Sequence, residues 1–243
     1  MPPSALATGE AIILAGGLGT RLRGTIGDLP KPMAPVAGRP FLAWQLDALE
    51  RRGIREVILS VGYRADAIEG HFGARHGGLA IRYAREDSPL GTGGAIDAAL
   101  GNVRGNAAFV LNGDTYIRPP LRALESCEGC EVAMLVAHVE DASRFGTVLV
   151  SGNRVTGFGE KRAEGPGLVN AGVYWIAKDA LAGQRPVTAF SFEKDFLEPA
   201  MGRIAIGAVV TSEPFVDIGI PESLRDAGVR VPELALGDVG PFV

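Results

Sequence analysis

The chain has 243 residues, 47% of them hydrophobic, with 24 Lys and Arg against 28 Asp and Glu and a formal net charge of −4. This length suffices for one large domain with a full core. No basic block stands out and no apolar run approaches the ~20 residues of a membrane span, so neither a nucleic acid polymer nor a membrane is an expected partner.

The first half of the chain alternates strands with helices. The opening residues MPPSALATGE lack a basic residue and a long apolar core, so we expect no secretory signal, only a tail, and a cytoplasmic protein. The apolar patterns predict strands over residues 11–15, 56–61, 80–84 and 107–111, and helices over residues 41–52, 65–72 and 94–100. This alternation is typical of a parallel sheet covered by helices on both faces.

The pattern changes after Pro120. Strands are predicted over residues 131–138, 171–176 and 204–210, a hairpin over residues 146–159, and a helix over residues 192–201. The chain is expected to end in a short tail after Val231-Pro232-Glu233. We therefore predict a single α/β domain over residues 1–243, with a Rossmann-like, mixed but mostly parallel sheet flanked by helices. It would have one half over about 10–115 and a smaller α+β half over about 116–225.

The most informative stretch runs over residues 10–40, EAIILAGGLGTRLRGTIGDLPKPMAPVAGRP. A strand leads directly into Gly16, Gly17 and Gly19, where a tight turn can bring backbone N–H groups close to an anion. Arg21 then offers a fork of donors suited to phosphate, and Lys31 stands between two prolines that stiffen its segment. The stretch predicts a phosphate-binding loop.

Two well-known glycine loops do not fit. The dinucleotide fingerprint needs a third small residue where this chain has Leu22, and the P-loop needs a Gly-Lys-Ser/Thr sequence that does not follow. A nicotinamide-dependent oxidoreductase and a P-loop NTPase are therefore disfavoured.

LAGGLGTRL followed by PKPMAPVAGRP resembles the signature of the sugar-1-phosphate nucleotidylyltransferases. The DLPKPMAPV version, together with EDSPLGTGGA, is most similar to the branch that transfers guanylyl groups to heptose 1-phosphate, although residues 23–29 depart from the Pro-Leu-Thr-like run of many members. The resemblance covers residues from about 10 to 224. It implies a GT-A-like nucleotidyltransferase fold, with a nucleoside triphosphate and a sugar 1-phosphate as substrates and Mg²⁺ as cofactor.

Two aspartates follow predicted strands. Asp114 follows the strand over residues 107–111, and Asp217 interrupts the short apolar run over residues 215–219. An Asp in an Asn-Gly-Asp sequence could equally belong to a turn. An unpaired buried carboxylate costs several kcal/mol, which a shared cation would offset. The resemblance implies that Asp114 and Asp217 together bind Mg²⁺.

The sugar-binding and catalytic residues are likewise implied by the resemblance. Lys161 would hold the sugar phosphate, although Glu160 and Lys161 could also be the exposed edge of a hairpin. The expected catalytic residues are Arg21, Lys31 and Lys161. The expected sugar-binding residues are Asn112, Gly146, Glu160 and Asn170. The expected nucleotide-binding residues are Leu14, Ala15, Gly16, Gly17, Gly19, Thr20, Glu86, Gly91, Thr92 and Gly93.

Glu86 is the candidate for reading the base. A carboxylate only accepts hydrogen bonds, so it matches the adjacent N1–H and N2–H₂ donors of guanine better than uracil, which has one N–H between two carbonyls. Glu86 therefore favours GTP, unless it is simply an exposed residue of the turn Glu86-Asp87-Ser88.

The expected reaction is in-line attack by the phosphate oxygen of a sugar 1-phosphate on the α-phosphorus of the triphosphate, with loss of pyrophosphate. The alternatives are a mannose-1-phosphate guanylyltransferase, a uridylyl- or thymidylyl-transferring relative, and a non-catalytic sugar-nucleotide sensor. The oligomeric state stays open, a homo-oligomer included.

The pair Cys127 and Cys130 lacks the second pair that a structural zinc would need. Redox chemistry remains open for it, but the reading we favour is a surface helix end with reduced thiols.

Overall fold

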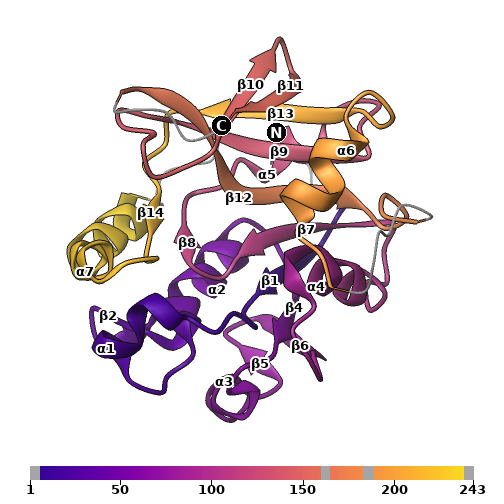
Figure 1. Ribbon diagram of the computed structural model, residues 1–243. Helices are drawn as coiled ribbons and strands as arrows, with labels where there is room; N and C mark the ends of the chain where they lie inside the picture. The colour runs from indigo at the N-terminus through magenta and orange to yellow at the C-terminus, as the bar shows by residue number, and fades with distance from the viewer. Residues whose placement is uncertain (1–5, 160–164, 183–188, 238–243) are drawn as a thin grey trace.

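The computed structural model describes residues 6–159, 165–182 and 189–237. A ten-stranded sheet runs through it in the order β10-β11-β13-β9-β12-β7-β1-β4-β6-β5, from the top of Figure 1 to the bottom. Its strands are β1 (Glu10–Leu14), β4 (Glu56–Val61), β5 (Arg75–His76), β6 (Leu79–Arg85), β7 (Ala107–Asn112), β9 (Val132–Val139), β10 (Thr147–Ser151), β11 (Arg154–Gly159), β12 (Gly167–Ala177) and β13 (Ile206–Thr211). The strands predicted from apolar patterns are confirmed, each within a few residues.

The sheet buries both faces, as successive side chains of β1 show. Ala11 and Ile13 join one apolar cluster and Ile12 joins the other, and all three are fully buried. The first cluster includes residues of α2 (Phe41–Arg51), α3 (Ala65–Phe72) and α5 (Leu121–Glu125). The second includes residues of α4 (Gly91–Leu100) and of the helical turn η3 (Phe192–Leu197). Helices therefore cover both faces, as expected of strands that lack a polar side.

The parallel part of the sheet is formed by β7, β1, β4 and β6. In the second half β9 and β13 are parallel, whereas β12 runs antiparallel to both β7 and β9 and the hairpin β10–β11 is antiparallel. The predicted α/β fold with a mixed sheet flanked by helices is thus confirmed. Strands of both predicted halves belong to this one sheet.

A short antiparallel pair outside the main sheet joins distant parts of the chain. β8 (Thr115–Tyr116) pairs with β14 (Val216–Asp217), so that Asp217 is the register partner of Thr115. The N–H of Ile218 also donates to the carbonyl of Asp114, at 2.9 Å. This pairing brings the two aspartates, 103 residues apart in the sequence, to neighbouring positions.

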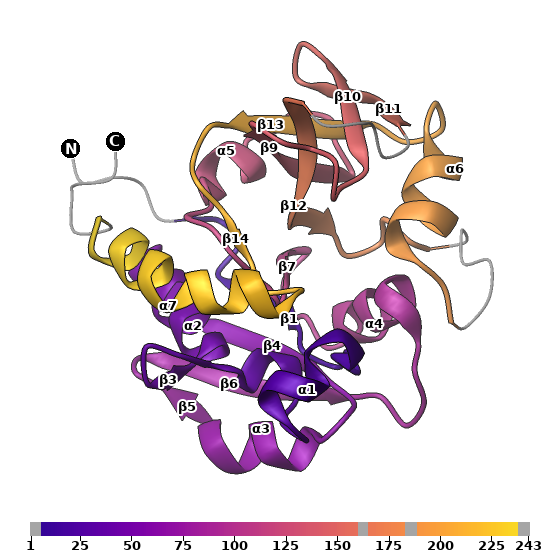
Figure 2. The same ribbon diagram turned by 60° about the vertical axis from the view of Figure 1, so that its left-hand side comes forward.

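The tail expected from Glu233 onward begins too early, because α7 (Pro221–Leu236) continues past that residue. Leu224, Ala227 and Val231 recur at helical spacing on its buried side, and Pro221 suits the first turn of a helix. Figure 2 shows α7 lying alongside α2, and its buried residues share an apolar cluster with Phe41. The internal Pro232 concealed this helix from the sequence pattern.

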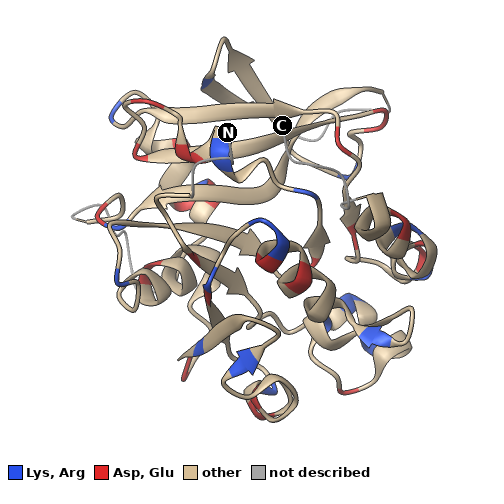
Figure 3. Ribbon diagram, turned by 180° about the vertical axis from the view of Figure 1, so that it is seen from behind, with Lys and Arg blue, Asp and Glu red and all other residues tan. Residues whose placement is uncertain are grey.

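Charges of both signs are interspersed along the ribbon on the side seen in Figure 3. Within the three described stretches of the chain, we find no helix with the length and apolar character needed to cross a bilayer.

Candidate functional site

A cavity of about 420 Å³ opens where the parallel strands end. The carboxyl ends of β1, β4 and β6 meet there, since the N–H of Ala15 donates to the carbonyl of Ser60 and the N–H of Glu86 donates to that of Val61. Ligands of open α/β sheets bind at this edge. Its walls include six of the predicted nucleotide-binding residues: Leu14, Gly16, Gly17, Glu86, Gly91 and Thr92. We refer to it as the first cavity.

Glycine is favoured at positions 16 and 19 for different structural reasons. A Cβ on Gly16 would lie 2.5 Å from Oε1 of Glu86, so a side chain at this position would displace that carboxylate. Gly19 has a φ of 57°, which a side chain disfavours, and it packs against Lys31. Ala15 is buried, whereas Gly19 and Thr20 lie beyond the walls of this cavity.

Glu86 is held in place by hydrogen bonds to both of its carboxylate oxygens. Oε1 accepts from the hydroxyl of Ser60 at 3.2 Å, and Oε2 accepts from the N–H of Leu90 at 3.1 Å. Each oxygen has a second lone pair, so the carboxylate can still accept from a ligand in the first cavity. The wall of the same cavity includes Tyr63, an aromatic residue two positions after the end of β4, for which the sequence pattern gave no signal.

Gly91 and Gly93, at the start of α4, pack against Phe190, and Gly91 also belongs to the wall of the first cavity. A Cβ on Gly93 would lie 2.1 Å from the Phe190 ring, and one on Gly91 would lie 2.5 Å from the Phe190 carbonyl. The N–H of Gly93 also donates to that carbonyl at 2.9 Å. Gly93 is outside the walls of the first cavity, so its absent side chain serves the packing of α4 against the segment that precedes η3.

A second cavity, of about 880 Å³, adjoins the first. Leu14 in the wall of the first is the register partner of Asn112 in the wall of the second. The second cavity includes five residues that were predicted to bind sugar or metal: Asn112, Asp114, Gly146, Asn170 and Asp217. Glu160 and Lys161 lie outside the described residues.

The turn that presents Asp114 is fixed from three sides. Nζ of Lys31 donates to Oδ2 of Asp114 at 2.5 Å. The buried amide of Gln45 donates to the carbonyls of Asn112 and Thr115, each at 2.8 Å. The N–H of Gly113 donates to the carbonyl of Leu14 at 3.0 Å. Gln45 gives no signal in the sequence, because it stands on the apolar face of α2 and its role depends on a turn 67 to 70 residues away.

Asp217 is oriented by its own neighbours. Its Oδ1 accepts from the N–H of Gly219 at 2.9 Å and from the guanidinium of Arg144 at 3.3 Å. Arg144 lies in the wall of the second cavity, beside the predicted Gly146. We had not singled out Arg144, although it directly precedes Phe145-Gly146.

Asp114 and Asp217 form a donor set suited to a hard divalent cation. Both lie in the wall of one cavity, and their backbones are neighbours across β8 and β14. Mg²⁺ in nucleotide sites is held by one or two carboxylates and completed by substrate phosphates and water. Among the described residues no cluster of three or more His, Cys, Asp or Glu side chains could hold a metal, so a cation here would need such completion.

Arg21 belongs to neither cavity wall. It is exposed on the turn η1 (Thr20–Leu22). Its expected role in binding phosphate remains a prediction.

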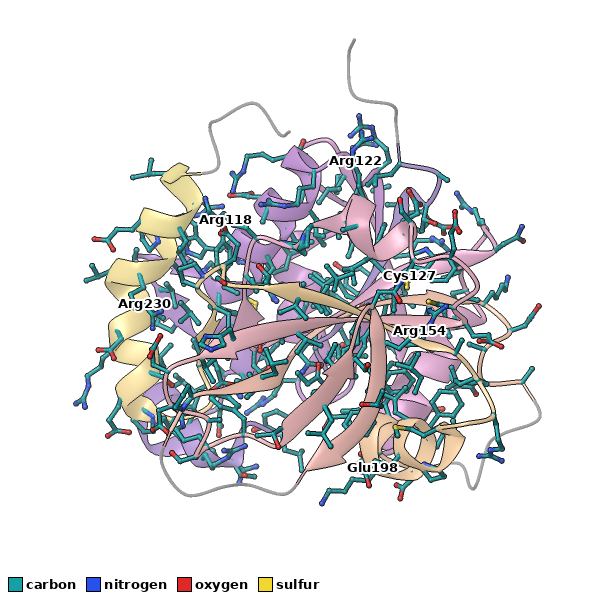
Figure 4. All side chains as sticks on the ribbon, turned by 90° about the horizontal axis from the view of Figure 1, so that it is seen from above. Arg118, Arg122, Cys127, Arg154, Glu198 and Arg230 are labelled. Carbon is teal, nitrogen blue, oxygen red and sulfur yellow. The ribbon has the colours of Figure 1, made fainter. Side chains whose placement is uncertain are left out.

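The cysteine pair lies away from both cavities. Cys127 and Cys130 are free thiols just after α5, and the guanidinium of Arg154 contacts both sulfurs. Figure 4 shows Cys127 and Arg154 close to each other. Burial and then Cys127 raise the pKa of the Cys130 thiol to about 11, which outweighs the opposing charge of Arg154. The expected position at a helix end is confirmed, whereas the reduced state of the thiols remains a prediction.

The family model described as nucleotidyl transferase matches residues 10–233. The chain belongs to this family. Two family members named D-glycero-alpha-D-manno-heptose 1-phosphate guanylyltransferase are similar to it along most of its length. The one from Aneurinibacillus thermoaerophilus is 39% identical over 221 residues, covering 90% of this chain and 96% of the relative. The one from Campylobacter jejuni is 41% identical over 214 residues, covering 88% and 96%.

The solved structure of HddC from Yersinia pseudotuberculosis has the same nucleotidyl transferase fold. It superimposes with a TM-score of 0.82 at 36% identity, covering 91% of this chain and 98% of HddC. HddC has also been solved in complex with GMP-PN, with the same TM-score and coverage. The resemblance stated from the glycine loop and the PKPMAPV segment is thereby confirmed, and with it the expectation of a nucleotidyltransferase enzyme.

Proposed function

We propose that this protein transfers a guanylyl group from GTP to D-glycero-α-D-manno-heptose 1-phosphate, giving the GDP-sugar and pyrophosphate. The observation that carries the proposal is the adjacency of two cavities, the second of which has Asp114, the partner of Lys31, in its wall. The first contains the glycine loop and Glu86, and the second contains Asp114, Asp217 and Asn170. The names of the two relatives that align over almost their whole length support the choice of base and sugar.

The reaction forms a bond between the sugar phosphate oxygen and the α-phosphorus, and breaks the bond from that phosphorus to the oxygen bridging to the β-phosphate. The nucleophile is already an anion, so no general base is required. The protein contributes to the rate by placing the two phosphates in line and by neutralising the charge between them.

The expected role of each residue follows from its position in the two cavities. The backbone of the glycine loop would hold the triphosphate in the first cavity, with guanine donating to Glu86. Lys31 would neutralise the α-phosphate, since its segment packs on Gly19 and its Nζ reaches Asp114 in the wall of the second cavity, although Lys31 itself belongs to neither wall. Asn170 and the backbone at Gly146 would bind the sugar in the second cavity.

Mg²⁺ fits Asp114 and Asp217, which supply hard oxygen ligands from one wall. When bound, it would supply positive charge to the phosphates at the junction. Gln45 keeps the Asp114 turn in place for this, and Arg144 keeps Asp217 in place. Arg21 and Lys161 remain the candidates for the departing pyrophosphate and the sugar phosphate.

The test is a product assay. Purified protein with Mg²⁺ is incubated with ATP, CTP, GTP, UTP or dTTP and with heptose, mannose, glucose or N-acetylglucosamine 1-phosphate, and pyrophosphate release is followed. We expect the highest rate with GTP and heptose 1-phosphate. A clear preference for mannose 1-phosphate would instead identify a mannose-1-phosphate guanylyltransferase. A preference for UTP or dTTP would identify a uridylyl- or thymidylyl-transferring enzyme. If the protein binds these substrates but releases pyrophosphate with no combination of them, it is a non-catalytic sugar-nucleotide sensor.

A further inference from the structure

The second cavity has a polar wall opposite its carboxylates. Glu193, Lys194 and Glu198 belong to this wall, on η3 and the adjoining α6 (Glu198–Ala200). In Figures 1 and 2 these helical turns lie on the far side of the second half from β14, and Figure 4 labels Glu198 on that side. The sequence analysis assigned no role to this wall.

Glu193 is tied to a predicted sugar-binding residue. The amide of Asn170 donates to Oε1 of Glu193 and, at 2.5 Å, to the hydroxyl of Tyr174. The hydroxyl of Tyr174 lies 3.4 Å from the same Oε1. The N–H of Gly172 donates to Oδ1 of Asn170 at 2.9 Å, which fixes the orientation of the amide.

The backbone around Asn170 is shaped for this arrangement. The register of β12 with β9 shifts between Asn170 and Tyr174, and Gly172 has a φ of 69° beside the Asn112 side chain. Such bulges turn a side chain toward a site next to a sheet. The result is that Asn170 and Tyr174 both reach Glu193 from the sheet.

Glu193 stands on a well-anchored turn. Phe192 is 1% exposed and packs edge-on against Tyr174 with ring centroids 5.2 Å apart. The N–H of Phe192 donates to the hydroxyl of Thr92 at 2.9 Å, which ties η3 to the start of α4. Burial and then the charge of Glu193 raise the pKa of Tyr174 well above its ordinary value, so the phenol stays a donor.

The carboxylate keeps acceptor capacity for a ligand. Oε1 takes the bonds from Asn170 and Tyr174, and none of the described residues donates to Oε2. The residue itself is exposed at the cavity wall. An oriented carboxylate oxygen beside an amide is suited to the hydroxyl groups of a sugar, which need acceptors.

We propose that Glu193 binds hydroxyls at the end of the sugar remote from its phosphate, and selects a sugar with a hydroxylated chain beyond the sixth carbon. This inference rests on the proposed function, which places the phosphate of the sugar beside Asp114 and Asp217. The ring then lies beside Asn170, and its exocyclic chain reaches the wall formed by η3.

The experiment compares heptose 1-phosphate with mannose 1-phosphate, which lacks the seventh carbon and its hydroxyl, at saturating GTP and Mg²⁺. For Glu193→Gln we expect the KM for heptose 1-phosphate to rise about tenfold, since charged hydrogen bonds are stronger than neutral ones. The KM for mannose 1-phosphate should change less than threefold, and kcat and the KM for GTP should stay near wild type. Glu193→Asp should recover part of the loss.

The matched control is Asp195→Asn, on the same turn but outside the cavity wall. Its Oδ2 accepts from the N–H of Ser191, which an amide oxygen can also do. Equal rises in KM for both sugars, or no rise for either, would overturn the assignment of Glu193. If the wild-type protein releases no pyrophosphate with either sugar, the proposed function itself fails. If wild type uses heptose 1-phosphate and the ratio of the two KM values is unmoved in Glu193→Gln, only this inference fails.

Discussion

Nζ of Lys31 lies 2.5 Å from Oδ2 of Asp114, and the two side chains are 12% and 33% exposed. A cation expected to neutralise phosphate and a carboxylate expected to bind Mg²⁺ are thus paired with each other. The proposed reaction requires both to change partners when a triphosphate arrives with its cation. Until substrates bind, the ion pair keeps both charges compensated, which avoids the cost of an unpaired charge.

Replacing Lys31 by Ala tests this exchange. We expect kcat for pyrophosphate release to fall about 10²–10³-fold, the usual effect of removing a group that stabilises transition-state charge. We also expect the substrate-free protein to bind Mn²⁺ more tightly, because Lys31 no longer competes for Oδ2 of Asp114. Steady-state kinetics and electron paramagnetic resonance titration with Mn²⁺ measure the two effects.

Arg225→Ala is the control for lost positive charge, because Arg225 is 72% exposed on α7 and pairs only weakly with Glu222 at 3.5 Å. It should leave both quantities near wild type. Near-normal turnover of Lys31→Ala with an unchanged circular dichroism spectrum would remove Lys31 from the mechanism.

The parts of the site that the sequence predicted are those that lie next to strands. Gly16, Glu86 and Asp114 each follow a strand whose apolar run was visible, and the parallel order then brings them to one edge of the sheet. Asp217 was reached by a different argument, the cost of an unpaired carboxylate in an apolar run, and the β8–β14 pair places it beside Asp114.

The parts that the sequence did not reveal depend on contacts between distant segments. Gln45 looks like an ordinary core position of α2 until its bonds to the carbonyls of Asn112 and Thr115 are seen. Glu193 was one charge within Glu193-Lys194-Asp195, and only the bulge at Gly172 brings Asn170 to it. Likewise Gly93 is predicted from the sequence to bind nucleotide, whereas the Phe190 ring occupies the space beside it.

Glu86→Gln tests how the base is read. An amide can donate to uracil and loses the negative acceptor for the two donors of guanine, so we expect the ratio of kcat/KM for GTP over UTP to fall about tenfold or more. The hydrogen bonds from Ser60 and Leu90 can continue to the amide oxygen only one at a time, so thermal unfolding should be followed in parallel.

Asp87→Asn is the control for Glu86→Gln. It removes a negative charge from the wall of the same cavity and should leave the ratio near wild type. An unchanged ratio in Glu86→Gln would show that Glu86 does not recognise the base. Its role would then be structural, through the hydrogen bond from Leu90 that stabilises the turn over residues 86–90.

Gly113→Ala tests the packing of the turn that presents Asp114. The added Cβ would lie 2.3 Å from the Leu14 carbonyl and 3.3 Å from the Pro32 ring, so the turn must shift. We expect a loss of about 1–3 kcal/mol in the free energy of unfolding, as for other overpacked positions, and a lower kcat because Asp114 moves with the turn.

Gly70→Ala provides the opposite case, since Gly70 lies in α3 with nothing within 4 Å of an added Cβ. It should gain about 0.5–1 kcal/mol from helix propensity. Denaturant titration measures both variants, and equal stabilities would contradict the packing argument.

The Cys130 thiol yields a prediction for pH. Burial and then Cys127 raise its pKa to about 11 despite the adjacent Arg154, so the neutral thiol is the dominant form at neutral pH. Only the thiolate is alkylated, and its fraction grows tenfold for each pH unit while the pH stays below the pKa. The iodoacetamide rate at Cys130, followed by peptide mass spectrometry, should therefore rise without a plateau from pH 7 to pH 9.5. A small thiol with its ordinary pKa near 8.5 in the same reaction should level off above pH 9. A plateau for Cys130 below pH 9 would mean that Arg154 outweighs burial and stabilises the thiolate.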